Sequence, residues 1–180
     1  VGPAGAALQA ELVALARGHG MRLLGPNTLG AYDAGSGACP TFSSLLEGGL
    51  PPVGPLAIVS QSGAYGAHIA MLARQRGIGL ARLMTTGNEA DVTIADCVAL
   101  CARDPSVGLI GIYAEGIRDG PALVAAIASA RAAGKPVVVM KVGRSDAGTA
   151  AARSHTASLA GDDAVFAAPM ERARRVRAAT

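Results

Sequence analysis

Two segments of the sequence carry side chains suited to phosphoryl transfer. Ser154-His155-Thr156 places an imidazole between two hydroxyl groups in a run of small residues. An imidazole can act as a nucleophile and form a covalent phosphoryl intermediate. A carboxylate on its other ring nitrogen fixes the tautomer and raises its nucleophilicity, and Glu115 in the segment YAEG is the candidate. For each residue alone, a simpler interpretation stays open: a surface histidine and a solvated acid.

The segment SQSG at 60–63 has the composition of an anion-binding turn. Ser60 and Ser62 can cap a helix, and Gly63 lets backbone N–H groups approach a ligand. A helix N-terminus carries about half a positive charge and free N–H donors, which suit phosphate. The segment is neither a P-loop nor a G-x-G-x-x-G motif. Plain helix capping is the alternative interpretation.

Alternating strands and helices must position these groups. Apolar runs predict strands at 54–60, 78–87, 107–116 and 135–143, and helices at 61–77, 91–104, 119–134 and 161–174. Strands that are apolar almost throughout are buried on both faces, and short strand–helix repeats give a parallel sheet. We therefore predict an α/β fold with a flavodoxin-like, doubly wound parallel sheet. Ligands bind such sheets beyond the carboxyl ends of the strands, where the segments above lie.

The turn after the second predicted strand is TTGNEADV. Gly87 and Asn88 suit a sharp turn there, and Asp91 is predicted to cap the following helix. Lys141, near the end of the last predicted strand, and Arg144, directly after it, add cations to the same edge. Together with His155, these groups suit a phosphoryl ligand.

The N-terminal part looks like the end of a preceding domain. Leucines at helical spacing predict a helix that ends near Gly18 and Gly20, followed by a strand at 21–25. We assign residues 1–30 to that domain, 31–54 to a linker or long loop of turn composition, 55–170 to the flavodoxin-like domain and 171–180 to a basic tail.

The composition excludes several classes of protein. Of 180 residues, 51% are hydrophobic and 16% charged, which supports a buried core, and the net charge of +3 gives no nucleic-acid footprint. No apolar run is long enough for a transmembrane helix, so we expect neither nucleic acid nor membrane as a partner. Three cysteines fit a reducing, cytoplasmic setting. Cys97 and Cys101, four residues apart, favour small buried side chains over a metal or redox pair.

Five segments in order resemble one enzyme family. GPNTLG, SQSGAYG, TTGNEADV, YAEGIRD and KPVVVMKVGRSDAGTAAARSHTASLAG together resemble the NDP-forming acyl-CoA synthetases, relatives of the succinyl-CoA synthetase α subunit that include ADP-forming acetyl-CoA synthetases. Each motif is weak alone, but their order and spacing are specific. Thr28 stands where the family pattern leads us to expect Cys or Ser.

The resemblance implies a reaction and roles for residues. Acyl-CoA, phosphate and NDP would give acid, CoA and NTP through an acyl phosphate and a phosphohistidine. His155 matches the phosphorylated histidine and Glu115 the glutamate that supports it. Ser62 and Gly63 match the helix N-terminus that grips phosphate. The remaining predicted site residues are Ser60, Ser154 and Thr156 at the phosphate, and Asn27, Gly87 and Asn88 in the active-site loops.

The resemblance also implies cofactors and partners. Coenzyme A would bind a Rossmann-like CoA-binding domain, of which residues 1–30 would be the C-terminal part. ATP or ADP and Mg²⁺ would bind an ATP-grasp domain or subunit outside this chain, and the assembly would be an oligomer. The residues predict no metal site of the chain's own, and the fragment alone would be inactive.

Two other functions are compatible with the fold. Protein lysine acetyltransferases carry a related, inactive synthetase region that binds CoA or phosphate for regulation, in which the histidine is typically lost. The presence of His155 and Glu115 favours the enzyme. A flavin-binding flavodoxin is disfavoured, because the chain has few aromatic residues to stack on the flavin ring.

Overall fold

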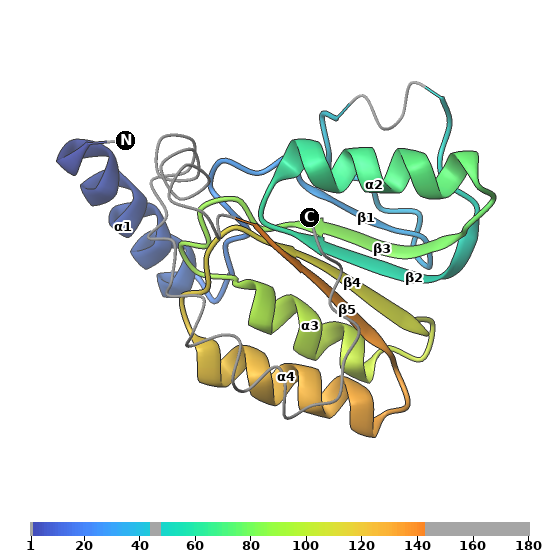
Figure 1. Cartoon of the computed structure of the whole chain (residues 1–180). Helices are drawn as coiled ribbons and strands as arrows, with labels where there is room; N and C mark the ends of the chain where they lie inside the picture. Colours follow the sequence, from blue (N-terminus) through green and yellow to red (C-terminus); the bar gives the residue numbers. More distant parts are fainter. Residues whose placement is uncertain (1, 44–47, 143–180) are drawn as a thin grey trace.

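A computed structural model describes residues 2–43 and 48–142 of the chain. A five-stranded sheet lies between helices, with α2 on one face and α3 and α4 on the other (Figure 1). The elements in chain order are α1 (Pro3–Gly18), β1 (Ala31–Asp33), β2 (Val53–Ser60), α2 (Gly63–Gln75), β3 (Leu80–Thr85), α3 (Ile94–Arg103), β4 (Leu109–Ala114), α4 (Gly120–Ala132) and β5 (Val137–Lys141).

The strand order is β1-β3-β2-β4-β5, and all neighbours pair in parallel except β1 and β3. The parallel part, β3-β2-β4-β5, has the order of a flavodoxin-like sheet. The predicted fold class is therefore confirmed, apart from one antiparallel edge strand. Because β2 lies between β3 and β4, the topological switch point lies at the carboxyl ends of β2 and β4.

Strand β1 falls within the segment that was expected to be a linker or loop. Tyr32 is buried, and the strand pairs with β3 through Ala31↔Met84 and Asp33↔Arg82. A three-residue strand between turn-forming residues is too short to show alternation, so its sequence reads as loop.

The predicted strand at 21–25 is wrong. These residues form no strand; their backbone instead contacts the loop after β3, where Val92 N donates to Leu23 O (3.1 Å) and Ala90 N to Gly25 O (2.9 Å). The helix before them is confirmed as α1, yet none of its residues is buried. The leucines that give α1 its helical spacing, Leu8, Leu12 and Leu15, are exposed among the described residues.

The core consists of small aliphatic side chains on both faces of the sheet. Cys97 and Cys101 belong to it, and burial raises the pKa of Cys97 to about 12 and that of Cys101 to about 11. They are packed, protonated thiols, as expected from their spacing. In the part of the chain that the structure describes, no helix could cross a membrane and no cluster of His, Cys, Asp and Glu could hold a metal ion.

Candidate active site

The N-terminus of α2 lies at the switch point, directly after β2. Ser62 is the N-cap, and its hydroxyl accepts a hydrogen bond from Tyr65 N (3.2 Å). The first N–H groups of a helix have no partner within it and form an anion site together with the helix dipole. Gly63 begins the helix where a Cβ would lie 2.5 Å from Leu29 Cγ. A glycine is therefore required for the loop at Leu29 to pack against this helix end.

Ser60 is the last residue of β2 and is fully buried. Its hydroxyl donates to Ser62 O (2.6 Å), which shapes the turn into α2. In this conformation the hydroxyl holds the turn at the N-terminus of α2, and the predicted contact of Ser60 with phosphate stays a prediction.

Glu115 follows β4 at the same switch point. Its Oε2 is buried and has no hydrogen-bond partner among the described residues. The charge of Glu115 contributes, after burial, to raising the pKa of Tyr113, whose ring stacks on Tyr65 of α2 with 4.2 Å between centroids. Glu115 N donates to Gln61 Oε1 (2.6 Å), so the residue lies beside the turn that leads into α2. A buried acceptor without a partner is costly, which marks this atom as a place for a donor.

The predicted loop residues Asn27, Gly87 and Asn88 are brought together. Asn27 Nδ2 donates to Asn88 Oδ1 (3.2 Å), and Asn88 N donates to Pro26 O (2.9 Å). Gly87 has φ +57°, and a Cβ there would lie 2.3 Å from Asn27 O. Only a glycine permits this approach of the two loops.

Thr28 ties the same loop to the sheet. Its hydroxyl lies 2.7 Å from Thr85 Oγ1 and accepts from Gly30 N (3.0 Å). Thr28 departs from the Cys or Ser expected from the family pattern, and its hydroxyl holds this loop to the sheet.

Asp91 does not cap α3, and that prediction is wrong. The cap is Thr93, which forms a capping box with Asp96. Asp91 instead accepts hydrogen bonds from Arg17 Nη2 (2.6 Å), Arg22 Nε (2.9 Å) and Leu23 N (2.8 Å). These bonds lower the pKa of Asp91 well below its usual range. The carboxylate joins the N-terminal segment to the loop after β3.

Glu89 is a buried acid that the sequence did not reveal. Its Oε1 accepts from Thr86 Oγ1 (2.9 Å) and Ile94 N (2.8 Å). Burial raises the pKa of Glu89 above its ordinary value, and these hydrogen bonds oppose the rise. An acid in a turn is normally exposed, so no local signal predicted its burial.

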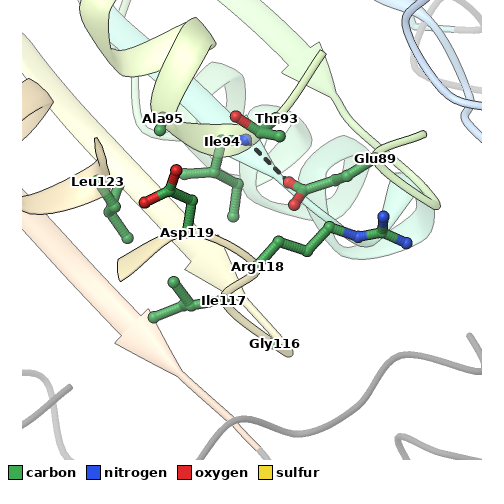
Figure 2. A pocket seen from close by; sticks show the side chains of 9 residues that line it. All are labelled: Glu89, Thr93, Ile94, Ala95, Gly116, Ile117, Arg118, Asp119 and Leu123. Atoms are coloured by element: carbon green, nitrogen blue, oxygen red, sulfur yellow. Dashed lines mark hydrogen bonds between the residues drawn. The ribbon is translucent and has the colours of Figure 1, made fainter. Parts of the chain in front are cut away.

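A small pocket lies beside Glu89, between the N-termini of α3 and α4 (Figure 2). Figure 2 shows the Glu89 carboxylate bonded to Ile94 N, with Arg118 alongside. The lining residues are Glu89, Thr93, Ile94, Ala95, Gly116, Ile117, Arg118, Asp119 and Leu123. The predicted residues Ser154, His155 and Thr156 lie outside the described residues, as do the predicted helix at 161–174 and the basic tail.

Comparison with protein families identifies the fold family. The sequence model of the succinyl-CoA ligase-like flavodoxin domain matches residues 53–180, most of the chain. The chain belongs to this family. The succinyl-CoA ligase-like flavodoxin domain therefore accounts for β2 to β5 and the residues after them.

Curated relatives of this succinyl-CoA ligase-like domain are acyl-CoA ligases. The α subunit of ADP-forming acetate–CoA ligase I from Pyrococcus furiosus is 38% identical over the whole chain, which spans 38% of that subunit. A trans-feruloyl-CoA synthase from an unknown prokaryotic organism is 36% identical over 91% of the chain, which spans 23% of that enzyme. The chain thus covers well under half the length of these relatives.

A solved structure agrees with the fold. The dinucleotide-forming acetyl-coenzyme A synthetase 1 of Ca. Korarchaeum cryptofilum, in complex with phosphate and ADP, superposes with a TM-score of 0.84 at 33% identity. The match covers 96% of this chain and 37% of that one. The resemblance found in the sequence motifs is therefore confirmed at the level of the family.

Proposed function

We propose that this chain is the phosphohistidine-bearing domain of an NDP-forming acyl-CoA synthetase. The reaction converts acyl-CoA, phosphate and NDP into acid, CoA and NTP. The observation that carries the proposal is the Oε2 of Glu115, which is buried and has no hydrogen-bond partner among the described residues, in a residue bonded through its backbone to the turn before α2. A carboxylate and an anion site side by side suit a histidine that accepts a phosphoryl group.

Each step forms one bond and breaks one. A phosphate oxygen attacks the acyl carbonyl and displaces the CoA thiolate, which gives an acyl phosphate. A ring nitrogen of His155 then attacks phosphorus, and the carboxylate of the acid leaves. A terminal phosphate oxygen of the NDP finally attacks the phosphohistidine and regenerates the imidazole, with NTP as product.

The residues of this chain hold charge and orient the imidazole. Glu115 accepts the hydrogen bond of the second ring N–H of His155, which fixes the tautomer and stabilises the cation that forms on phosphorylation. The N–H groups at the start of α2, with Ser62 and Gly63, hold phosphoryl oxygens. Asn27 and Asn88 line the path by which the phosphoryl group approaches the start of α2. CoA, nucleotide and Mg²⁺ would be held by a CoA-binding domain and an ATP-grasp domain or subunit.

The test is phosphorylation of His155 in the full-length protein with its partner domains. The protein is mixed with Mg²⁺ and γ-labelled ATP and quenched at alkaline pH, and the acid-labile label is mapped. We expect label on His155, none in His155→Ala and labelling slowed at least about tenfold in Glu115→Gln. No label in a folded protein that binds nucleotide would contradict the proposal and favour a regulatory region of the lysine acetyltransferase type.

A further inference from the structure

All four backbone polar groups of Glu115 and Gly116 are hydrogen-bonded by two buried side chains. Gln61 Oε1 accepts from Glu115 N (2.6 Å) and Gly116 N (2.8 Å), and Gln61 Nε2 donates to Gly116 O (2.7 Å). Lys141 Nζ donates to Glu115 O (2.9 Å). We call Gln61 and Lys141 the clamp of the Glu115 loop.

The two clamp residues come from the strands on either side of β4. Gln61 follows β2, and its own N–H donates to Tyr113 O (3.0 Å), which extends the pairing of β2 with β4 by one residue. Lys141 ends β5, and Val142 N donates to Ala114 O (3.0 Å). Glu115 is therefore held from both neighbours at the position where β4 leaves the sheet.

Burial makes this clamp costly to disturb. Gln61 is 6% exposed and Lys141 is 4% exposed. A buried amide or ammonium is tolerated only when its hydrogen bonds are made. A side-chain amide is neutral and carries an acceptor oxygen for two N–H groups and a separate N–H donor for a carbonyl. A glutamine between Ser60 and Ser62 thus matches the loop that it holds.

We propose that Gln61 and Lys141 are positioning residues that direct the Glu115 carboxylate toward the reacting histidine. The inference rests on the proposed function, because it assigns the purpose of the clamp to the phosphohistidine step. Gln61 lies within the SQSG turn, so the same residue joins the N-terminus of α2 to the backbone that carries the Glu115 carboxylate. A displacement of about 1 Å of a reacting group can slow a reaction about a hundredfold.

The fold contains a matched control for a merely structural role. Lys135 is also buried, with 9% exposure, and its Nζ donates to Cys101 O (2.8 Å) and to Asp104 O at the C-terminal end of α3. It satisfies backbone carbonyls as Lys141 does, but it precedes β5 rather than ending it. Lys135→Met should cost stability in the same way as Lys141→Met without affecting Glu115.

The experiment is a double-mutant cycle in the full-length protein. The rate of His155 labelling is measured for Gln61→Met, Lys141→Met and Lys135→Met, each in the wild-type and the Glu115→Gln background. We expect the two clamp substitutions to slow labelling by about tenfold to a hundredfold in the wild type. In the Glu115→Gln background we expect less than about a threefold further loss, because residues that act through one another are not additive. Lys135→Met should change neither rate.

If Gln61→Met does not fold, Lys141→Met carries the test, and Lys141→Arg provides the conservative variant. Arginine keeps a charged N–H donor for Glu115 O, so it should be slowed less than Lys141→Met and show the same lack of additivity. Equal losses for a clamp variant in both backgrounds, or no loss beyond that of Lys135→Met, would overturn the inference while leaving the proposed function intact. An unlabelled wild type would instead overturn the proposed function itself.

Discussion

Asp91 holds Arg22 across the boundary between the N-terminal segment and the flavodoxin-like domain. Arg22 Nε lies 2.9 Å from Asp91 Oδ2, and the side chain of Asp91 is fully buried. Leu23 N and Arg17 bond the same carboxylate. A buried acid with so many donors acts as an anchor for residues 17–23 on the loop after β3.

We expect Asp91→Asn to lower the melting temperature by roughly 5 °C at neutral pH, because charged hydrogen bonds are replaced by weaker ones. The folded-state pKa of Asp91 is lowered, so the unfolded chain binds more protons at acidic pH. Its contribution to stability is therefore complete above the unfolded value near pH 4 and decreases as the pH falls toward the folded value. Thermal unfolding between pH 3 and 7 measures the effect.

Glu11 provides the control for this prediction. It is an exposed acid on α1, and Glu11→Gln should leave the melting temperature unchanged. If Asp91→Asn were as stable as Glu11→Gln at pH 7, the anchoring role of Asp91 would be refuted.

Gly87 should be far less replaceable than another glycine of the same backbone conformation. Gly87 and Gly77 have φ of +57° and +68°, but only Gly87 would place a Cβ against Asn27 O, whereas Gly77 has nothing within 4 Å. Gly77→Ala should cost about 1 kcal/mol from the left-handed conformation. Gly87→Ala should cost about 1–3 kcal/mol more, because the two loops must separate.

Urea denaturation of both variants measures this difference. The labelling of His155 should also slow in Gly87→Ala and not in Gly77→Ala, since Gly87 brings Asn27 and Asn88 together. Equal free energies of unfolding would show that the loop before β1 can move away without cost.

The strands of the sheet and the helices between them could be predicted, because strands that are buried on both faces consist of continuous apolar runs. The location of the site segments was also predictable, since Ser62, Gly87 and Glu115 each come directly after a strand, at the edge where ligands bind. Strand β1 was not, because its three residues offer no period. The apolar run at 21–25 has the composition of a strand, but its backbone bonds to a loop instead of a strand, as Leu23 O does with Val92 N.

The errors at the site come from contacts between residues far apart in sequence. Asp91 precedes α3 and has the residue type of an N-cap, but arginines about 70 positions earlier take its carboxylate. The role of Gln61 could not be predicted, because a glutamine between two serines has no local signature. Its partners Glu115 and Gly116 come together with it only when β2 and β4 pair.

Substitutions at Ser62 and Thr93 should separate the effect of helix capping from the effect of phosphate binding. Both are hydroxyl N-caps, of α2 and α3, that accept from the N–H three residues later. Ser62→Ala and Thr93→Ala should each cost about 1 kcal/mol of stability. Only Ser62→Ala should slow the labelling of His155, by about tenfold or more, because it disturbs the N–H groups that hold the phosphoryl oxygens. Equal labelling by the two variants would argue against an anion site at α2.

Glu89 should make the protein less stable as the pH rises. Burial raises its pKa in the folded state, so between the unfolded value near 4.3 and the folded value the native protein binds more protons than the unfolded chain, and stability falls with increasing pH. Glu89→Gln removes this titration, and its amide oxygen can still accept from Thr86 and Ile94 N. We expect the variant to be at least as stable as the wild type at pH 7, with an advantage that shrinks toward pH 4.5. Urea midpoints across this range measure it, with Glu11→Gln as the control at an exposed position. A Glu89→Gln protein that is destabilised more at pH 7 than at pH 4.5 would mean that the charged carboxylate stabilises the N-terminus of α3 by more than its burial costs.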